Sequence, residues 1–286
     1  MSFSAISQLD LSELPAPEVV ETLDYEAIVA AMLADLRTRD PVFDALVESD
    51  PAYKVLQVAA YRELLIRARV NDAARGLMLA FATGGNLDQI GANKGVVRLA
   101  GESDSDFRKR IQLSPEGFTT AGSEGSYVFH GLSASPDVKD IQAVSPNPGE
   151  VVVYVLSRTG DGTAAAPLLA TVDAALSAET VRPLTDQVTV QSADVTTYAI
   201  TAELTIYPGP DAEIVRSAAE AAVRVYAAAV HRLGYDVTLS GLYAALHREG
   251  VQGVTLTAPT ANLVAGLGEA YFANAFTVTV AGLPDV

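Results

Sequence analysis

Three histidines are the residues of this chain best suited to acid-base chemistry, because an imidazole titrates near neutral pH. They are His130, His231 and His247. A nucleophilic site would join Ser240 to His247 and use Asp236 to orient the ring. Ser240, however, stands just before an apolar helical segment, where a serine normally caps the helix. We therefore expect Ser240 to be a cap and the histidines to lie at helix ends.

Two further segments raise the question of metal or phosphate binding. The acidic cluster Glu102, Asp104 and Asp106 lacks the long ligand loop and distal Glu of a calcium site, and its Ser/Asp pattern is typical of a helix start capped by Ser103. The glycine-rich segment 159–163 lacks the Gly-Lys-Ser/Thr ending of a phosphate loop and predicts a turn that leads into a helix capped by Thr163. The sequence thus predicts no catalytic, cofactor or metal site.

Composition and charge restrict the function classes further. The formal net charge is −16, which disfavours nucleic acid as a partner because phosphate binding depends on Lys and Arg. Cys is absent, which excludes disulfides and thiolate metal sites. The first residues lack the pattern of a secretory signal, and no apolar run reaches the about 20 residues that span a bilayer. We expect a cytoplasmic product with no membrane contact.

The N-terminal part is predicted to be helical. A first helix falls within residues 21–40, and a longer one runs from Ala52 to Phe81. A helix of about 30 residues is about 45 Å long, more than a domain of about 100 residues needs to cover its own core. Its apolar positions at three-four spacing are expected to face a partner: Val58, Tyr61, Leu65 and Ala68.

The C-terminal part contains one pattern twice, in residues 126–144 and 240–256. Each copy predicts a short helix, a step into a strand, and a later strand that pairs with it. We therefore expect an α+β fold, in which a helical N-terminal region is followed by two tandem related α+β modules. The predicted boundaries are 1–100, 101–194 and 195–286.

A long helix in the second module carries an apolar row. Asp211 is expected to cap this helix, and the row contains Ile214, Ala218, Ala221, Val225 and Ala228. Such a row either faces a partner or closes the core of its own module. Of the two, we expect the core.

The order of short motifs along the chain resembles the baseplate J-like family, the baseplate wedge proteins of contractile-tailed bacteriophages and of phage-tail-like bacteriocins. The likeness extends from about Leu14 to Leu256. The matching residues are Leu87, Asp88, Gly91, Arg98, Asp106 to Arg108, Gly122 to Tyr127, Val138, Asp140, Gly149 to Val153, Arg182 to Leu184, and Asp186.

This resemblance implies a structural protein without a catalytic residue. Its N-terminal helices would join a bundle with a second wedge protein of the tail-protein-I type, and its C-terminal module would link neighbouring wedges. Implied partners are other copies of the chain, as a dimer within a wedge and as a ring of wedges, and a small sheath-initiator-like wedge protein. The linking surface would lie in residues 240–256, with Tyr243 and Leu246 as candidates.

Localisation would then change during assembly, from the cytoplasm of the producing bacterium to the baseplate of a phage tail or a tail-like particle. The chain would form a ring around the tail tube and help to relay the trigger for sheath contraction. A soluble adaptor of another multiprotein complex is the alternative, since duplicated α+β modules suit that function, and an enzyme ranks third. Three observations distinguish these classes. Sedimentation with tail particles would support the baseplate subunit, and a stable complex with an unrelated cytosolic protein would support the adaptor. Turnover that depends on a pocket residue would support an enzyme.

Overall fold

The computed structural model describes residues 11, 14–15, 17–119, 122–209 and 211–281. Among these, the chain divides into two compact units. One contains the described parts of Gln8–Arg98 with Ser103–Ile111, and the other contains those of Leu99–Glu102 and Gln112–Val286. We call them the helical unit and the strand-containing unit.

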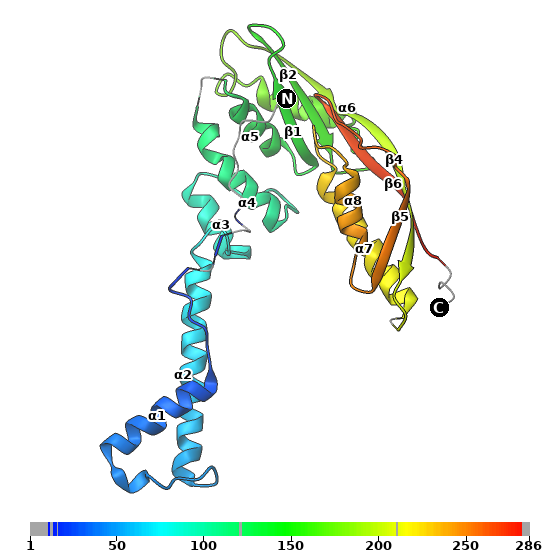
Figure 1. The fold of residues 1–286 in the computed structure, drawn as a ribbon. Coiled ribbons are helices and arrows are strands. Elements are labelled where there is room, and N and C mark those ends of the chain that lie inside the picture. Colours follow the sequence, from blue (N-terminus) through cyan, green and yellow to red (C-terminus); the bar gives the residue numbers. More distant parts are fainter. Residues whose placement is uncertain (1–10, 12–13, 16, 120–121, 210, 282–286) are drawn as a thin grey trace. The chain divides into compact units, whose positions relative to one another are not determined.

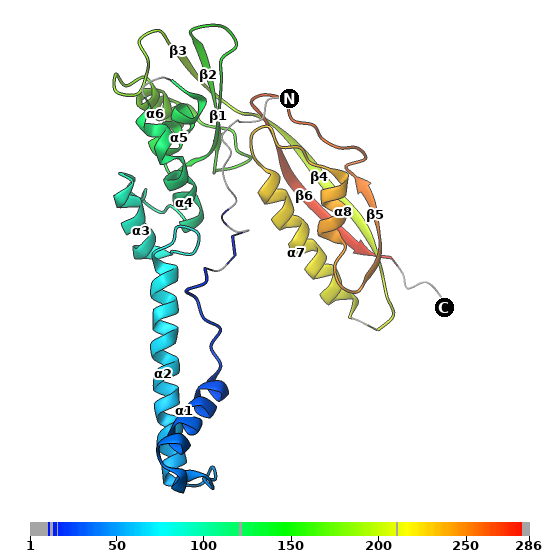
Figure 2. The ribbon, with the colours of Figure 1, turned by 60° about the vertical axis from the view of Figure 1, so that its left-hand side comes forward.

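The helical unit is built around one long helix. Its elements are α1 (Tyr25–Arg39), the 3₁₀ turn η2 (Pro41–Phe43), α2 (Pro51–Gly76), α3 (Gly84–Asn93) and most of α4 (Asp104–Leu113). The Asp24 carboxylate caps α1 by accepting from two backbone N–H groups, and Pro51 opens α2 at a position where its missing N–H costs nothing. The short helix α1 packs on one side of α2 (Figures 1 and 2). Helix α2 ends at Gly76, earlier than the pattern predicts, and a turn follows.

The first module of the strand-containing unit is a three-stranded sheet covered by helices on one face. Its elements are η3 (Ser114–Phe118), α5 (Glu124–Ala134), β1 (Val138–Val144), β2 (Glu150–Ser157), α6 (Ala166–Leu176) and β3 (Gln187–Ser192). Strand β2 lies in the centre, antiparallel to β1 and parallel to β3, so the predicted pairing of β1 with the strand that follows it is confirmed. The core lies between this sheet and helices α5 and α6.

The second module also has three strands and two helices. Its elements are β4 (Asp194–Ile206), α7 (Ala212–Val230), α8 (Leu239–Leu246), β5 (Val251–Ala258) and β6 (Glu269–Val280). The central strand is β4, antiparallel to β5 and parallel to β6. Helices α7 and α8 lie on one face of this sheet (Figures 1 and 2). Each module thus pairs a central strand with one antiparallel and one parallel neighbour, and the α+β class is confirmed.

The strand order of the second sheet differs from the prediction. Strand β5 was expected to pair with the strand after it, but β4 occupies the central place and separates β5 from β6. The connection in the first module, residues 145–149, is short enough only for a hairpin, whereas residues 259–268 are long enough to reach the far edge of the sheet.

Two predicted helix caps are also corrected. Thr238, not Ser240, caps α8 by accepting from the N–H of Gly241, and α6 begins after Ala165 and not at Thr163. The caps predicted at Ser103 and Asp211 are confirmed, since both side chains accept from the first turn of their helices. The predicted boundaries at residues 100 and 194 remain predictions.

The apolar row predicted to close the second core faces outward. The side of α7 that packs on the sheet consists of Val215, Ala219, Val223 and Ala227. The predicted row is exposed, and both of its large members, Ile214 and Val225, are 70% exposed. The expectation of a core position for this row was therefore wrong.

Candidate interaction site

Helix α2 exposes most of the residues that the sequence selects as an interface. Val58, Tyr61 and Leu65 are 63%, 52% and 42% exposed, and Ala68 is half-buried. With about 100° between successive residues, the three large side chains lie on one side of the helix. We call Val58, Tyr61, Leu65 and Ala68 row 1.

A second exposed row, which was not predicted from the sequence, lies beside it. Val55, Ile66 and Val70 are 68%, 66% and 53% exposed. At 100° per residue they lie on a neighbouring face of α2, which Arg62 and Arg69 separate from row 1. The seven-residue spacing of Ala59, Ile66 and Ala73 is the sequence signal that indicates this face. We call Val55, Ile66 and Val70 row 2.

The remaining side of α2 is covered within the helical unit. Ala60 is fully buried there, and Tyr25 of α1 donates from its hydroxyl to the carbonyl of Gln57. The Asn71 amide, only 6% exposed, forms a pair of hydrogen bonds with the backbone of Glu21, at 3.0 and 2.9 Å. The segment before α1 is thereby held against α2, whereas the large side chains of rows 1 and 2 stay exposed.

The segment that follows α2 is held by arginines that belong to the motifs shared with the baseplate J-like family. The guanidinium of Arg98 joins Asp88 and Asp104, at 2.7 and 2.8 Å. The Asp104 carboxylate also accepts from the Gly84 N–H, and this bond and the Arg98 charge lower its pKa. Arg108 donates to the carbonyls of Leu79 and Ala82, in the segment after α2. These contacts tie α3 and α4 to that segment.

A buried aromatic ring fills the same corner. Phe107 is fully buried, and the guanidinium carbons of Arg98 and Arg110 lie 4.6 and 5.6 Å from its ring centroid. Gly91 is required beside it, because a Cβ at that position would overlap the Phe107 ring. The motif residues of the helical unit thus stabilise packing between helices.

The motif residues of the first module have a similar structural role. The Tyr127 hydroxyl, on a side chain 2% exposed, donates to the Asp186 carboxylate at 2.7 Å. Burial and this bond raise the pKa of Tyr127. Gly122, at φ +68°, leaves room for Pro183, and Arg182 donates to the backbone of Asp186. These contacts fix the loop before β3 to the helix before β1.

The two candidates in the second module have different surroundings. Tyr243 is 40% exposed on α8 and is available for contact. Leu246 is fully buried in the core between α8 and the sheet, because Leu242, Ala245 and Leu246 form the inward side of this short helix. Leu246 is therefore removed from the candidate surface.

The residues considered for a nucleophilic site are not brought together. The Ser240 hydroxyl donates to Thr238, the Asp236 carboxylate accepts from the backbone of Ala265, and His247 ends α8 with its backbone N–H bonded to Tyr243. His231 ends α7 in the same way, whereas His130 lies inside α5. The helix-end placement is thus found for two of the three histidines.

The described residues contain no group of three or more His, Asp or Glu side chains arranged to hold a metal ion.

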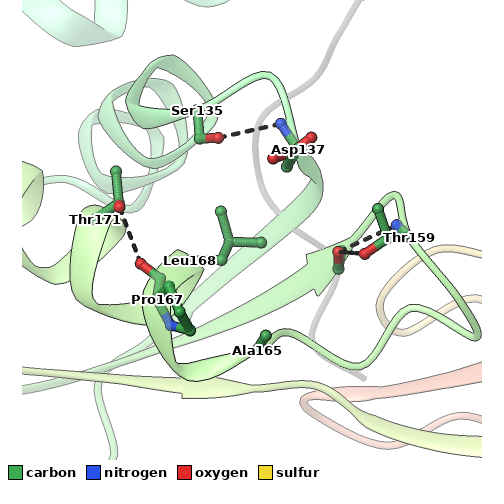
Figure 3. Close-up of a pocket in the computed structure, with 8 residues that line it drawn as sticks. Ser135, Asp137, Thr159, Ala165, Pro167, Leu168 and Thr171 are labelled. Atoms are coloured by element: carbon green, nitrogen blue, oxygen red, sulfur yellow. Dashed lines mark hydrogen bonds between the residues drawn. The ribbon is translucent and has the colours of Figure 1, made fainter.

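A cavity of about 290 Å³ lies in the first module, beside α6 (Figure 3). All four hydroxyls that line it are bonded to neighbours: Ser135 accepts from Asp137, Ser157 pairs with Thr159, and Thr171 donates to Pro167. No helix within the described ranges is apolar and long enough to cross a bilayer.

Comparison with known proteins agrees with the motifs. The baseplate J-like N-terminal domain matches residues 48–103, the central domain residues 119–192 and the C-terminal domain residues 198–280. Baseplate protein J of Escherichia phage P2 is 46% identical over 96% of this chain and 98% of its own length. The chain belongs to the baseplate J-like family.

Proposed function

We propose that this chain is a structural subunit of a baseplate, in which it acts as a wedge protein of a contractile tail. It would assemble with copies of itself and with other wedge proteins into a ring around the tail tube. The 46% identity to a phage baseplate protein, over nearly the full length of both chains, supports a structural role in a baseplate. It also favours a role in assembly over catalysis, and a location in the baseplate after synthesis in the producing bacterium.

The observation that best supports an assembly role is the exposed apolar surface of α2. Six large apolar side chains of rows 1 and 2, each between 42% and 68% exposed, lie on one helix. Exposed apolar patches of this kind mark surfaces that bind other proteins, because burying them releases about 25 cal/mol for each Å².

The division into two rows suggests the arrangement of the partners. A helix in a two-stranded pair needs one apolar face, whereas a helix in a bundle of three contacts two neighbours. We therefore propose that row 1 and row 2 bind two different helices. One would come from a second copy of this chain, and the other from a second wedge protein of the tail-protein-I type. A small sheath-initiator-like protein would bind elsewhere in the wedge.

The second module offers a further surface for linking neighbouring wedges. Tyr243 and the exposed row of α7, with Ile214 and Val225, are the apolar side chains that we assign to it. Closing a ring requires that each copy use two different surfaces, one within its wedge and one toward the next. A ring linked in this way would transmit a movement of one wedge to the next, as relaying the contraction trigger requires.

A pair of charge substitutions in row 1 tests the bundle. Tyr61→Asp with Leu65→Asp would bury two carboxylates at the proposed contact and should remove the chain from tail particles in its producing cell. Val42→Asp with Val47→Asp is the matched control, since both side chains are exposed in the same unit, at 76% and 57%, but lie outside both rows.

Circular dichroism of the purified variants separates assembly from folding. Because Tyr61 and Leu65 are about half exposed, we expect both variant chains to keep the helical signal of the wild type. Loss of the fold in the row 1 variant would show that row 1 is part of the core. Normal incorporation of the row 1 variant into particles would overturn the proposed bundle.

A further inference from the structure

The two modules of the strand-containing unit meet at a small junction that is separate from their cores. Its apolar part is formed by Leu156, Ala193, Leu233 and Ala270. Polar contacts surround it, with Gln142 of β1 accepting from the Gly268 N–H at 2.7 Å and Asp140 accepting from the Leu233 N–H at 3.1 Å. Because each module has its own larger core, the junction can open while both modules stay folded.

His231 lies at this junction in an unusual environment. It ends α7, is 6% exposed, and its ring centroid is 5.2 Å from that of Phe272. Its Nδ1 lies 2.9 Å from the Nζ of Lys139 on β1 of the other module. An ammonium group can only donate, so Nδ1 must accept and the imidazole must be neutral. The Nε2 atom is buried without a hydrogen-bond partner among the described residues.

The charges around His231 oppose its protonation. Burial, followed by the positive charge of Lys139, lowers the pKa of His231 to about 4. The backbone and carboxylate of Asp161, in the loop before α6, act in the opposite direction but more weakly. The next residue, Arg232, adds a further positive charge and faces Asp140, with 3.6 Å between Nε and Oδ2.

We infer that His231 and Lys139 form an acid-released latch between the two modules. Protonating the imidazole places two positive charges in direct contact within a buried site, and separating the modules returns both to water. The latch therefore changes the relation between the modules without unfolding either one. This inference concerns a single chain and does not rest on the proposed assembly.

The direction and size of the effect follow from proton linkage. In the open form His231 has its ordinary pKa of 6.5, and in the closed form its pKa is about 4. The open form binds more protons between these values, so closure is favoured above pH 6.5 and weakens as the pH falls toward 4. The opening equilibrium should rise about tenfold per pH unit, and about 300-fold in all.

A distance measurement on the full chain tests the latch. Because the chain has no Cys, Ser177→Cys directly after α6 and Ser217→Cys on α7 place one spin label on each module. The distance between the labels is measured by pulsed electron paramagnetic resonance from pH 7.5 to 3.5. Far-ultraviolet circular dichroism is recorded on the same samples. We expect the distance distribution to shift below pH 6 while the dichroism stays constant.

His231→Gln keeps a polar side chain that cannot be protonated, so its labels should remain at the closed distance at pH 4. His247→Gln is the matched control, because His247 ends α8 with nearly the same backbone angles but is exposed. This control should open as the wild type does. Opening of the His231→Gln variant at the same pH as the wild type would overturn the latch, and so would simultaneous loss of the dichroism signal.

A second variant keeps the test decisive if His231→Gln is already open at neutral pH. Lys139→Met removes the neighbouring charge, so the pKa of His231 should lie closer to its ordinary value. The total change in the opening equilibrium between pH 7.5 and 3.5 should then be smaller than in the wild type. A change in the opening equilibrium as large as that of the wild type, or larger, would contradict the latch.

Discussion

Replacing Tyr127 by Phe tests whether the motif residues of the first module act through stability. The substitution removes only the hydroxyl, which is buried and donates to the Asp186 carboxylate at 2.7 Å. A hydrogen bond to a charged group contributes about 1.5–3 kcal/mol, and the carboxylate would remain without this donor. We therefore expect Tyr127→Phe to lower the free energy of unfolding by about 2 kcal/mol.

Urea unfolding followed by circular dichroism measures this loss. Since the chain has two compact units, two transitions are expected, and only the one that involves the first module should move. Tyr243→Phe is the control, because that side chain is 40% exposed, and its change should stay within about 0.5 kcal/mol. The Tyr127→Phe variant should still enter tail particles at a permissive temperature. A loss below about 0.5 kcal/mol, or normal stability with failed assembly, would refute the structural role.

Two further substitutions test packing in the helical unit. Gly91→Ala places a Cβ where it overlaps the Phe107 ring and should reduce stability by about 1–3 kcal/mol. Gly85→Ala is the control, because no atom lies within 4 Å of the new Cβ and stability should not fall. Thermal unfolding compares the two variants. Asn71→Ala removes both hydrogen bonds to the Glu21 backbone and should speed amide hydrogen exchange around residue 21 by about tenfold or more. Unchanged exchange would show that these bonds do not hold the segment before α1.

The helices and their caps were largely predictable, because the information is local. Ser103 and Asp211 each stand directly before a helical pattern, and both act as caps. The cap of α8 was misplaced because Thr238 and Ser240 are both suitable, and only the position of the first helical turn decides between them.

The outward face of α7 was assigned incorrectly for a related reason. The rows that begin at Ile214 and Val215 are both apolar at helical spacing, and they lie about 100° apart on the same helix. Periodicity shows that each row exists but not which one contacts the sheet. The same ambiguity on α8 made buried Leu246 look equivalent to exposed Tyr243.

Contacts between distant residues could not be read from the sequence. Tyr127 and Asp186 are 59 positions apart, and Lys139 and His231 are 92 apart. The motif that contains Tyr127 was identified by resemblance, but its bond to Asp186 depends on how the loop before β3 lies against α5. Strand order has the same origin, since β4 takes the central place in its sheet only through tertiary packing.

The most direct test of the central proposal is to tag the chain in its producing cell, collect high-mass particles on a density gradient, and identify by mass spectrometry the proteins that sediment with it. A baseplate subunit should sediment with sheath, tube and small wedge proteins in fixed ratio to the tagged chain. A chain that stays at the top of the gradient, alone or with a metabolic enzyme, would contradict a role in the baseplate.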